Sequence, residues 1–242
     1  MNKRDILMTL VLAAALSCCG KHQPRHFVVL PDVSGSIERE SLEQAFKAIG
    51  ELVGHLHRGD QIAIIPILGD AQAEASGRIM RFEVPKERKA YDADLRDFQK
   101  KLGASLAEMR TNAAAHPGSK TDILGSLQLA EQEFQLDPRG SKRIVIVLSD
   151  FIQEDGQVDF RADKRLANKT EAQRFAMQFT SSWSLDFMGA HIFLGSLRSK
   201  EYAGLGQKRL QAIQRFWMTL FDISGAKSDF AIDGPGLLKK IF

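Results

Sequence analysis

The stretch FVVLPDVSGS, residues 27–36, joins an uninterrupted apolar run to a cluster of side-chain oxygens. The run Phe27–Leu30 shows no alternation of apolar and polar residues, which is typical of a strand buried on both faces of a parallel sheet. Asp32, Ser34 and Ser36 then place one carboxylate and two hydroxyls within a short piece of chain. Ligands of open α/β sheets bind beyond the carboxyl ends of the strands, so these oxygens lie where a site is expected.

Further apolar runs, over residues 62–68, 144–148 and 192–194, predict the other strands of a mostly parallel sheet. Between the strands, apolar residues recur at spacings of three and four, which predicts amphipathic helices. These helices are expected within residues 42–56, 95–109, 123–134, 172–183 and 210–220. Strands that alternate with helices imply right-handed crossovers, so the sequence predicts a doubly wound α/β sandwich with helices on both faces of its sheet.

Two other segments are expected to differ from these buried strands and amphipathic helices. Residues 78–84 alternate imperfectly and end at Pro85, which predicts one antiparallel edge strand. Residues 153–169 are the most charged part of the chain and are expected to form an excursion on the surface. No break in composition calls for a second domain, and we expect a single domain over residues 26–242.

The N-terminal residues predict a targeting segment. Lys3 and Arg4 precede an apolar run over residues 6–17, which is shorter than the roughly 20 residues that span a bilayer. The run and the two cysteines after it resemble a bacterial lipoprotein signal peptide. The resemblance implies that residues 1–18 form this signal and that Cys18, or else Cys19, carries lipid. The alternative is an ordinary cleaved secretion signal with incidental cysteines.

The lipoprotein interpretation predicts where the protein works. A tether over residues 19–25 would hold the domain outside the cytoplasm, in the cell envelope of a bacterium. Aspartate follows neither cysteine, which favours the outer membrane, facing the periplasm, in a Gram-negative source. The formal net charge of +3 comes without a basic stripe, so nucleic acid is not an expected partner. No cysteine lies beyond Cys19, so the domain has no internal disulfide.

Two more motifs complete a pattern that begins at Asp32. Thr121 stands at the start of the helix expected from Ile123, and Ser149-Asp150 follows the strand at 144–148. With the Asp-x-Ser-x-Ser run, and in this order, they resemble the von Willebrand factor type A (VWA) domain and its metal-ion-dependent adhesion site (MIDAS). The resemblance extends from about Arg25 to the C-terminus. It implies a Rossmann-like three-layer sandwich.

The resemblance also implies a role for each residue of the site. The hydroxyls of Ser34, Ser36 and Thr121 would contact the metal directly, and Asp32 and Asp150 would hold water molecules bound to it. Hard oxygen donors suit Mg²⁺ best, with Mn²⁺ or Ca²⁺ also possible. Because hydroxyls are neutral, the cation keeps its affinity for a further oxygen. A carboxylate from Asp or Glu of a protein partner is expected to supply that oxygen.

Other interpretations are open for the same residues. Ser36 and Thr121 could each cap the N-terminus of a helix, and Asp150 could be a solvated carboxylate at the end of a strand. Two departures from the family pattern concern Pro31, which costs the first strand a backbone donor, and Phe151, which stands where the family often has glycine. Phe151 could line the rim of the site or pack internally.

A metal-dependent hydrolase is the main alternative function, since Asp, Ser and a hard cation also support phosphoryl or ester chemistry. The sequence disfavours it because no histidine or lysine stands beside Ser34 or Ser36 as an activating base, with His116 the one possible exception. A degenerate scaffold would show a broken motif, and this motif is intact. We therefore expect a membrane-tethered binding module that is not an enzyme.

Overall fold

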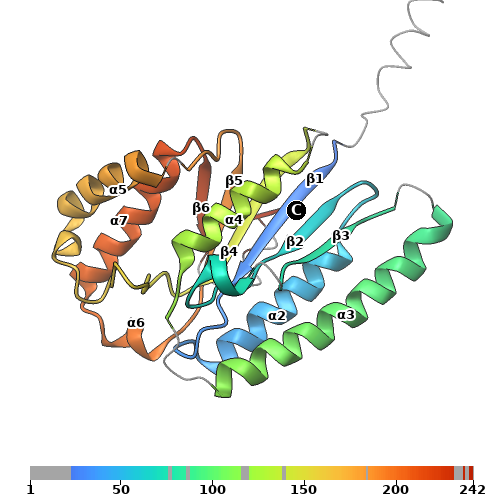
Figure 1. The fold of residues 1–242 in the computed structure, drawn as a ribbon, viewed down its shortest axis with the longest axis horizontal. Coiled ribbons are helices and arrows are strands. Elements are labelled where there is room, and N and C mark those ends of the chain that lie inside the picture. Colours follow the sequence, from blue (N-terminus) through green and yellow to red (C-terminus); the bar gives the residue numbers. More distant parts are fainter. Residues whose placement is uncertain are drawn as a thin grey trace, which may run out of the picture.

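The computed structural model describes residues 23–75, 78–85, 88–115, 120–137, 140–183, 185–231, 237 and 240–241. Six strands form one sheet in the order β3-β2-β1-β4-β5-β6 (Figure 1). β3 runs antiparallel to β2, and all other neighbouring strands are parallel. The predicted mostly parallel sheet with one antiparallel edge strand is thereby confirmed. The strands are β1 (Arg25–Pro31), β2 (Gln61–Ile64), β3 (Met80–Glu83), β4 (Lys142–Ser149), β5 (His191–Ser196) and β6 (Lys227–Ala231).

Helices cover both faces of this sheet and form two separate cores. The first core lies under α4, α5 and α7, and the second lies under α2 and α3. The predicted doubly wound three-layer sandwich is confirmed. The α-helices are α2 (Arg39–Gly54), α3 (Arg88–Ala115), α4 (Ile123–Gln135), α5 (Lys169–Trp183), α6 (Lys200–Gly204) and α7 (Gln207–Ile223), and the short turns are η1 (Ala71–Ala75) and η2 (Lys164–Leu166). No helix in these described ranges is long and apolar enough to cross a membrane.

β1 lies at the centre of the sheet, between β2 and β4. Its side chains alternate between the two cores: Val28 and Leu30 enter the first, and Phe27 and Val29 enter the second. All four are fully buried, which explains why the run carries no polar residue. The parallel partners β1 and β4 end together, so the residues that follow Pro31 and Ser149 emerge at the same edge of the sheet.

The structure differs from the sequence prediction in three places. β2 ends at Ile64 because Pro31 of β1 has no N–H to donate to the carbonyl of Ile65, although Ile65 and Ile67 still donate to carbonyls of β1. The edge strand β6 was not predicted, since its start carries the polar run Lys227-Ser228-Asp229. The segment 153–169 is more than a surface excursion, because Phe160 at its centre is fully buried.

Candidate metal site

The loop after β1 arranges its oxygens through its own hydrogen bonds. The backbone N–H of Ser34 donates to Oδ1 of Asp32 at 3.0 Å, and the hydroxyls of Ser34 and Ser36 lie 3.0 Å apart. Helix α2 begins only at Arg39, and its N-cap residue Glu38 makes no side-chain cap. The interpretation of Ser36 as a helix cap is therefore wrong, and its hydroxyl instead pairs with that of Ser34 at the edge of the sheet.

Thr121 is held by the loop that follows β4. Its N–H donates to the carbonyl of Glu154 at 2.8 Å, and the N–H of Glu154 donates back at 2.9 Å. The N-cap of α4 is Asp122, whose carboxylate accepts from the N–H of Gly125 at 2.8 Å. The capping interpretation of Thr121 is therefore also wrong, because its neighbour does the capping. The N–H of Asp122 donates to the carbonyl of Leu68, which keeps Thr121 at the edge where Asp32 lies.

Asp150 is buried where the sequence allowed a solvated carboxylate. The residue is 1% exposed, and its Oδ1 accepts a hydrogen bond from the N–H of Ile152 at 2.9 Å. Its Oδ2 is buried and has no hydrogen-bond partner among the described residues. A buried carboxylate oxygen without a partner lowers the free energy of unfolding, so this side chain has a role other than stabilising the fold.

Asp32 and Asp150 form a pair of buried like charges. Burial raises the pKa of Asp32, even though hydrogen bonds from Ser34 and from the Ser149 hydroxyl (2.7 Å) favour its charged form. Burial, and then repulsion from Asp32, raise the pKa of Asp150 to about 7. No ion pair with either carboxylate occurs within the described residues. Neither carboxylate therefore has a cationic partner among the described residues, and a bound cation would provide one.

The donor set fits a hard divalent cation and does not fit a soft one. Two buried carboxylates and three hydroxyl-bearing residues gather at one edge of the sheet: Asp32, Ser34, Ser36, Thr121 and Asp150. A group of three or more His, Cys, Asp or Glu side chains placed to hold a metal is absent from the described part of the chain. Hydroxyl oxygens are the other hard donors at this edge, and Mg²⁺, which keeps several waters, tolerates such a site.

Gln153 supports the site, although no sequence motif marks it. Its Oε1 accepts from the N–H groups of Ile123 and Leu124, at 2.8 and 3.1 Å, which are otherwise unpaired at the start of α4. Its Nε2 donates to Asp122 at 3.1 Å. This fully buried side chain thus fixes the start of α4, and with it Thr121, to the loop after β4.

The loop between β5 and α6 forms a further wall of the site. The hydroxyl of Ser199 lies against Asp150 and favours its charged form. The N–H of Glu38 donates to the carbonyl of Arg198 at 2.9 Å, which joins this loop to the start of α2. Glu201 is held at 3.0 Å by Arg161, from the segment that follows β4. None of Arg198, Ser199 and Glu201, the last of which lies in α6, belongs to a motif that the sequence marks as functional.

Phe151 packs inside the protein. Its ring contacts Trp217 and Phe230 edge-on, with centroids 6.4 and 5.4 Å apart, and its carbonyl accepts from the indole N–H of Trp217 at 3.0 Å. Its φ of 64° lies in the left-handed region that glycine adopts readily and other residues rarely do. Phe151 therefore adopts a backbone conformation that is typical of glycine, and this strains the backbone locally.

A scan against known protein families and a search of curated proteins find no match. Among solved structures, the pilus adhesin SpaC from Lactobacillus rhamnosus GG matches with a TM-score of 0.52 and 10% identity, over 92% of this chain and 30% of that chain. Its open conformation gives 0.50 and 10%, over 91% and 29%. A von Willebrand factor type A protein from Catenulispora acidiphila gives 0.49 and 14%, over 90% and 41%.

This chain thus spans about a third of the length of the pilus adhesin that it matches. At such low identity the likeness concerns the fold alone. Together with the strand order β3-β2-β1-β4-β5-β6, it shows that this chain has a VWA-like α/β fold.

Proposed function

We propose that this protein is a divalent-metal-dependent binding module that captures a carboxylate of a protein partner. The hydroxyls of Ser34, Ser36 and Thr121 would hold the metal directly, and Asp32 and Asp150 would hold it through water. Mg²⁺ fits this donor set best, with Mn²⁺ or Ca²⁺ as alternatives. The bound cation supplies an electrophilic position that an outside oxygen can occupy. The VWA-like fold, shared with a pilus adhesin, supports a role in adhesion or assembly.

The observation that carries the proposal is the orphaned Oδ2 of Asp150. It lies buried beside a second buried carboxylate, Asp32, and both have raised pKa values. A cation held nearby would remove both penalties at once, because it stabilises the charged form of each group. Neutral hydroxyls in direct contact would leave most of the cation's charge for the partner.

We also propose that the module is not an enzyme. The described histidines lie away from the site: His26 is the second residue of β1, His191 starts β5, and His55 and His57 precede β2. These positions are at the opposite edge of the sheet from Ser34. His116, the one candidate base in the sequence, lies outside the described residues. The geometry of the described part of the chain thus supports binding over hydrolysis.

The membrane anchor is part of the same proposal. Cys18 and Cys19, the signal peptide at residues 1–18 and most of the tether lie outside the described residues. The support is the sequence pattern, in which a basic start and a short apolar run precede the cysteines. A lipid on either cysteine would hold the domain in the cell envelope, facing away from the cytoplasm.

Mg²⁺ titration of the purified domain tests the metal site. A ligand that binds the folded state alone stabilises it by RT ln(1 + [L]/Kd), which is about 2.7 kcal/mol at 100 times Kd. We expect Mg²⁺ to raise the thermal midpoint of the wild type and to leave Ser34→Ala unchanged. Ser181→Ala, an exposed serine on α5, is the matched control and should respond like the wild type. The metal proposal fails if Mg²⁺, Mn²⁺ and Ca²⁺ all leave the wild-type midpoint unmoved.

Membrane fractionation tests the anchor independently. We expect the full chain in the membrane fraction and the double variant Cys18→Ser, Cys19→Ser in the soluble fraction. The single variants identify the lipidated residue. Retention of the double variant in the membrane would refute the lipid anchor and would leave the metal proposal intact.

A further inference from the structure

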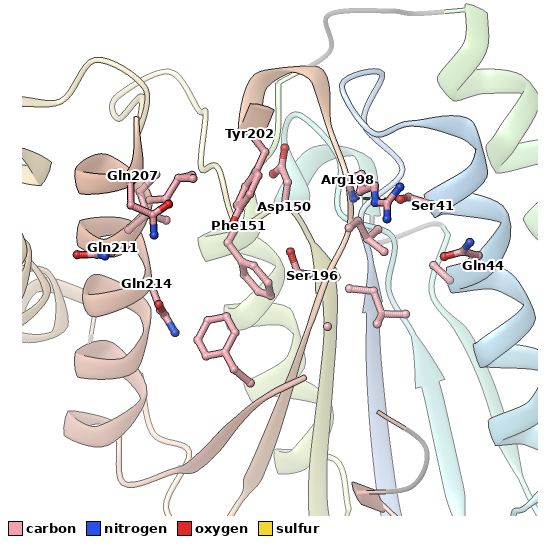
Figure 2. A pocket seen from close by; sticks show the side chains of 17 residues that line it. Ser41, Gln44, Asp150, Phe151, Ser196, Arg198, Tyr202, Gln207, Gln211 and Gln214 are labelled. Carbon is pink, nitrogen blue, oxygen red and sulfur yellow. Dashed lines mark hydrogen bonds between the residues drawn. The ribbon is translucent and has the colours of Figure 1, made fainter. Parts of the chain in front are cut away.

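A cavity of about 470 Å³ lies beside Asp150, between helices α2 and α7 (Figure 2). This volume is within the range of roughly 300–1,000 Å³ that ligand pockets occupy. Its walls include apolar side chains from β4, α7 and β6, together with the ring of Phe151. These apolar residues are Leu148, Phe151, Leu210, Ile213 and Phe230.

Four of the polar side chains around this cavity are uncharged amides. Gln207, Gln211 and Gln214 stand at spacings of four and three on α7, and Gln44 lies across the cavity on α2 (Figure 2). An amide offers both donors and an acceptor, as a peptide group does. None of the four amides makes a hydrogen bond with another described residue. The cavity therefore presents unused hydrogen-bonding groups suited to a neutral polar chain above an apolar lining.

Asp150 belongs to the cavity and to the candidate metal site alike. A partner chain that brings a carboxylate to the metal therefore has the cavity as its neighbour. Apart from Asp150, the charged residue that lines the cavity is Arg198. The apolar part of this lining favours an apolar group, because removing apolar surface from water is favourable.

We propose that this cavity binds an extended segment of the same partner, with a large apolar side chain inside it and the main chain against the glutamine amides. The inference rests on the proposed function and adds a second requirement to it. A recognised segment carries an Asp or Glu for the metal and, at one fixed spacing, a large aliphatic or aromatic residue for the cavity.

A random peptide library displayed on phage tests this requirement with the purified domain. The library is bound in Mg²⁺ and released with EDTA, so that selection depends on the metal. We expect enriched peptides to share one acidic residue and one large apolar residue at a constant spacing. Gln211→Trp would fill part of the cavity and should lower the affinity for a selected synthetic peptide about 10-fold or more. The same substitution on the exposed Gln173 of α5 should leave its affinity unchanged.

The remaining outcomes separate this inference from the proposed function. Peptides that share only an acidic residue, and that bind Gln211→Trp as they bind the wild type, would overturn the cavity and keep the metal-dependent function. A library that yields no Mg²⁺-dependent binder would overturn both. The Mg²⁺-induced rise in thermal midpoint should persist in Gln211→Trp, which shows that the variant is folded and holds metal.

Discussion

Replacing Asp150 by asparagine should make the metal-free protein more stable at alkaline pH. Its pKa of about 7 in the folded state lies about three units above the ordinary value of 3.8. Each unit corresponds to about 1.4 kcal/mol, so the buried charge costs about 4 kcal/mol once it is fully ionised. Between these two pKa values the folded protein keeps a proton that the unfolded chain releases. The free energy of unfolding therefore falls as pH rises from about 4 to 7.

Urea unfolding in EDTA measures this effect. The wild type should lose about 3 kcal/mol of its free energy of unfolding between pH 5 and pH 8 because of Asp150, and Asp150→Asn should not show this loss. Asp222→Asn, which removes an exposed charge at the end of α7, is the control and should keep the wild-type slope. Added Mg²⁺ should stabilise the wild type more at pH 8 than at pH 5, because it needs the ionised carboxylates, and should do little for Asp150→Asn. Equal pH slopes for wild type and Asp150→Asn would refute the reasoning.

Three further substitutions test the surroundings of the site. Gln153→Ala leaves two buried helix N–H groups unpaired, so we expect a loss of about 2–4 kcal/mol in urea unfolding and weaker Mg²⁺ binding by calorimetry. Phe151→Gly relieves strain of about 1–3 kcal/mol but removes a buried ring worth about 3–5 kcal/mol, so a net loss is expected and a gain in thermal midpoint would contradict this balance. Burial acts to raise the pKa of Asp60, but hydrogen bonds from Arg25 and from the His57 N–H outweigh it and lower that pKa. The stability that Asp60 contributes is present above about pH 4 and lost in acid. Asp60→Asn should therefore be less stable at pH 7, and its free energy of unfolding should fall less than that of the wild type in acid.

The fold was predictable because its central strands are buried on both faces. Apolar runs such as Phe27–Leu30 admit no other strand environment, and the helices between them carry clear periodicity. The edge strand β6 escaped prediction since it needs an apolar side chain on one face only, and its polar start at Lys227 hides the pattern. The early end of β2 follows from Pro31 on the neighbouring strand, which the apolar run of β2 does not reveal.

The site was predictable only as a set of positions. Motifs at the ends of strands and at the start of a helix identified Asp32, Thr121 and Asp150, but the choice between capping and metal contact depends on where each helix begins. Gln153 and Ser199 could not be found, because their roles come from contacts between elements far apart in the chain. A hydrogen bond across the fold leaves no periodic trace in the sequence.

The direction of β1 sets how the domain would stand on a membrane. This strand enters the sheet at Arg25, which an ion pair with Asp60 fastens at 2.6 Å, and it delivers Asp32 at the other end. Seven residues of strand at about 3.3 Å each separate the two ends by roughly 23 Å. A lipid attached upstream of Arg25 would therefore join the chain at the end of β1 opposite the five oxygen-bearing residues. The strand itself would thus separate the lipid-bearing end of the chain from the oxygens that meet a partner.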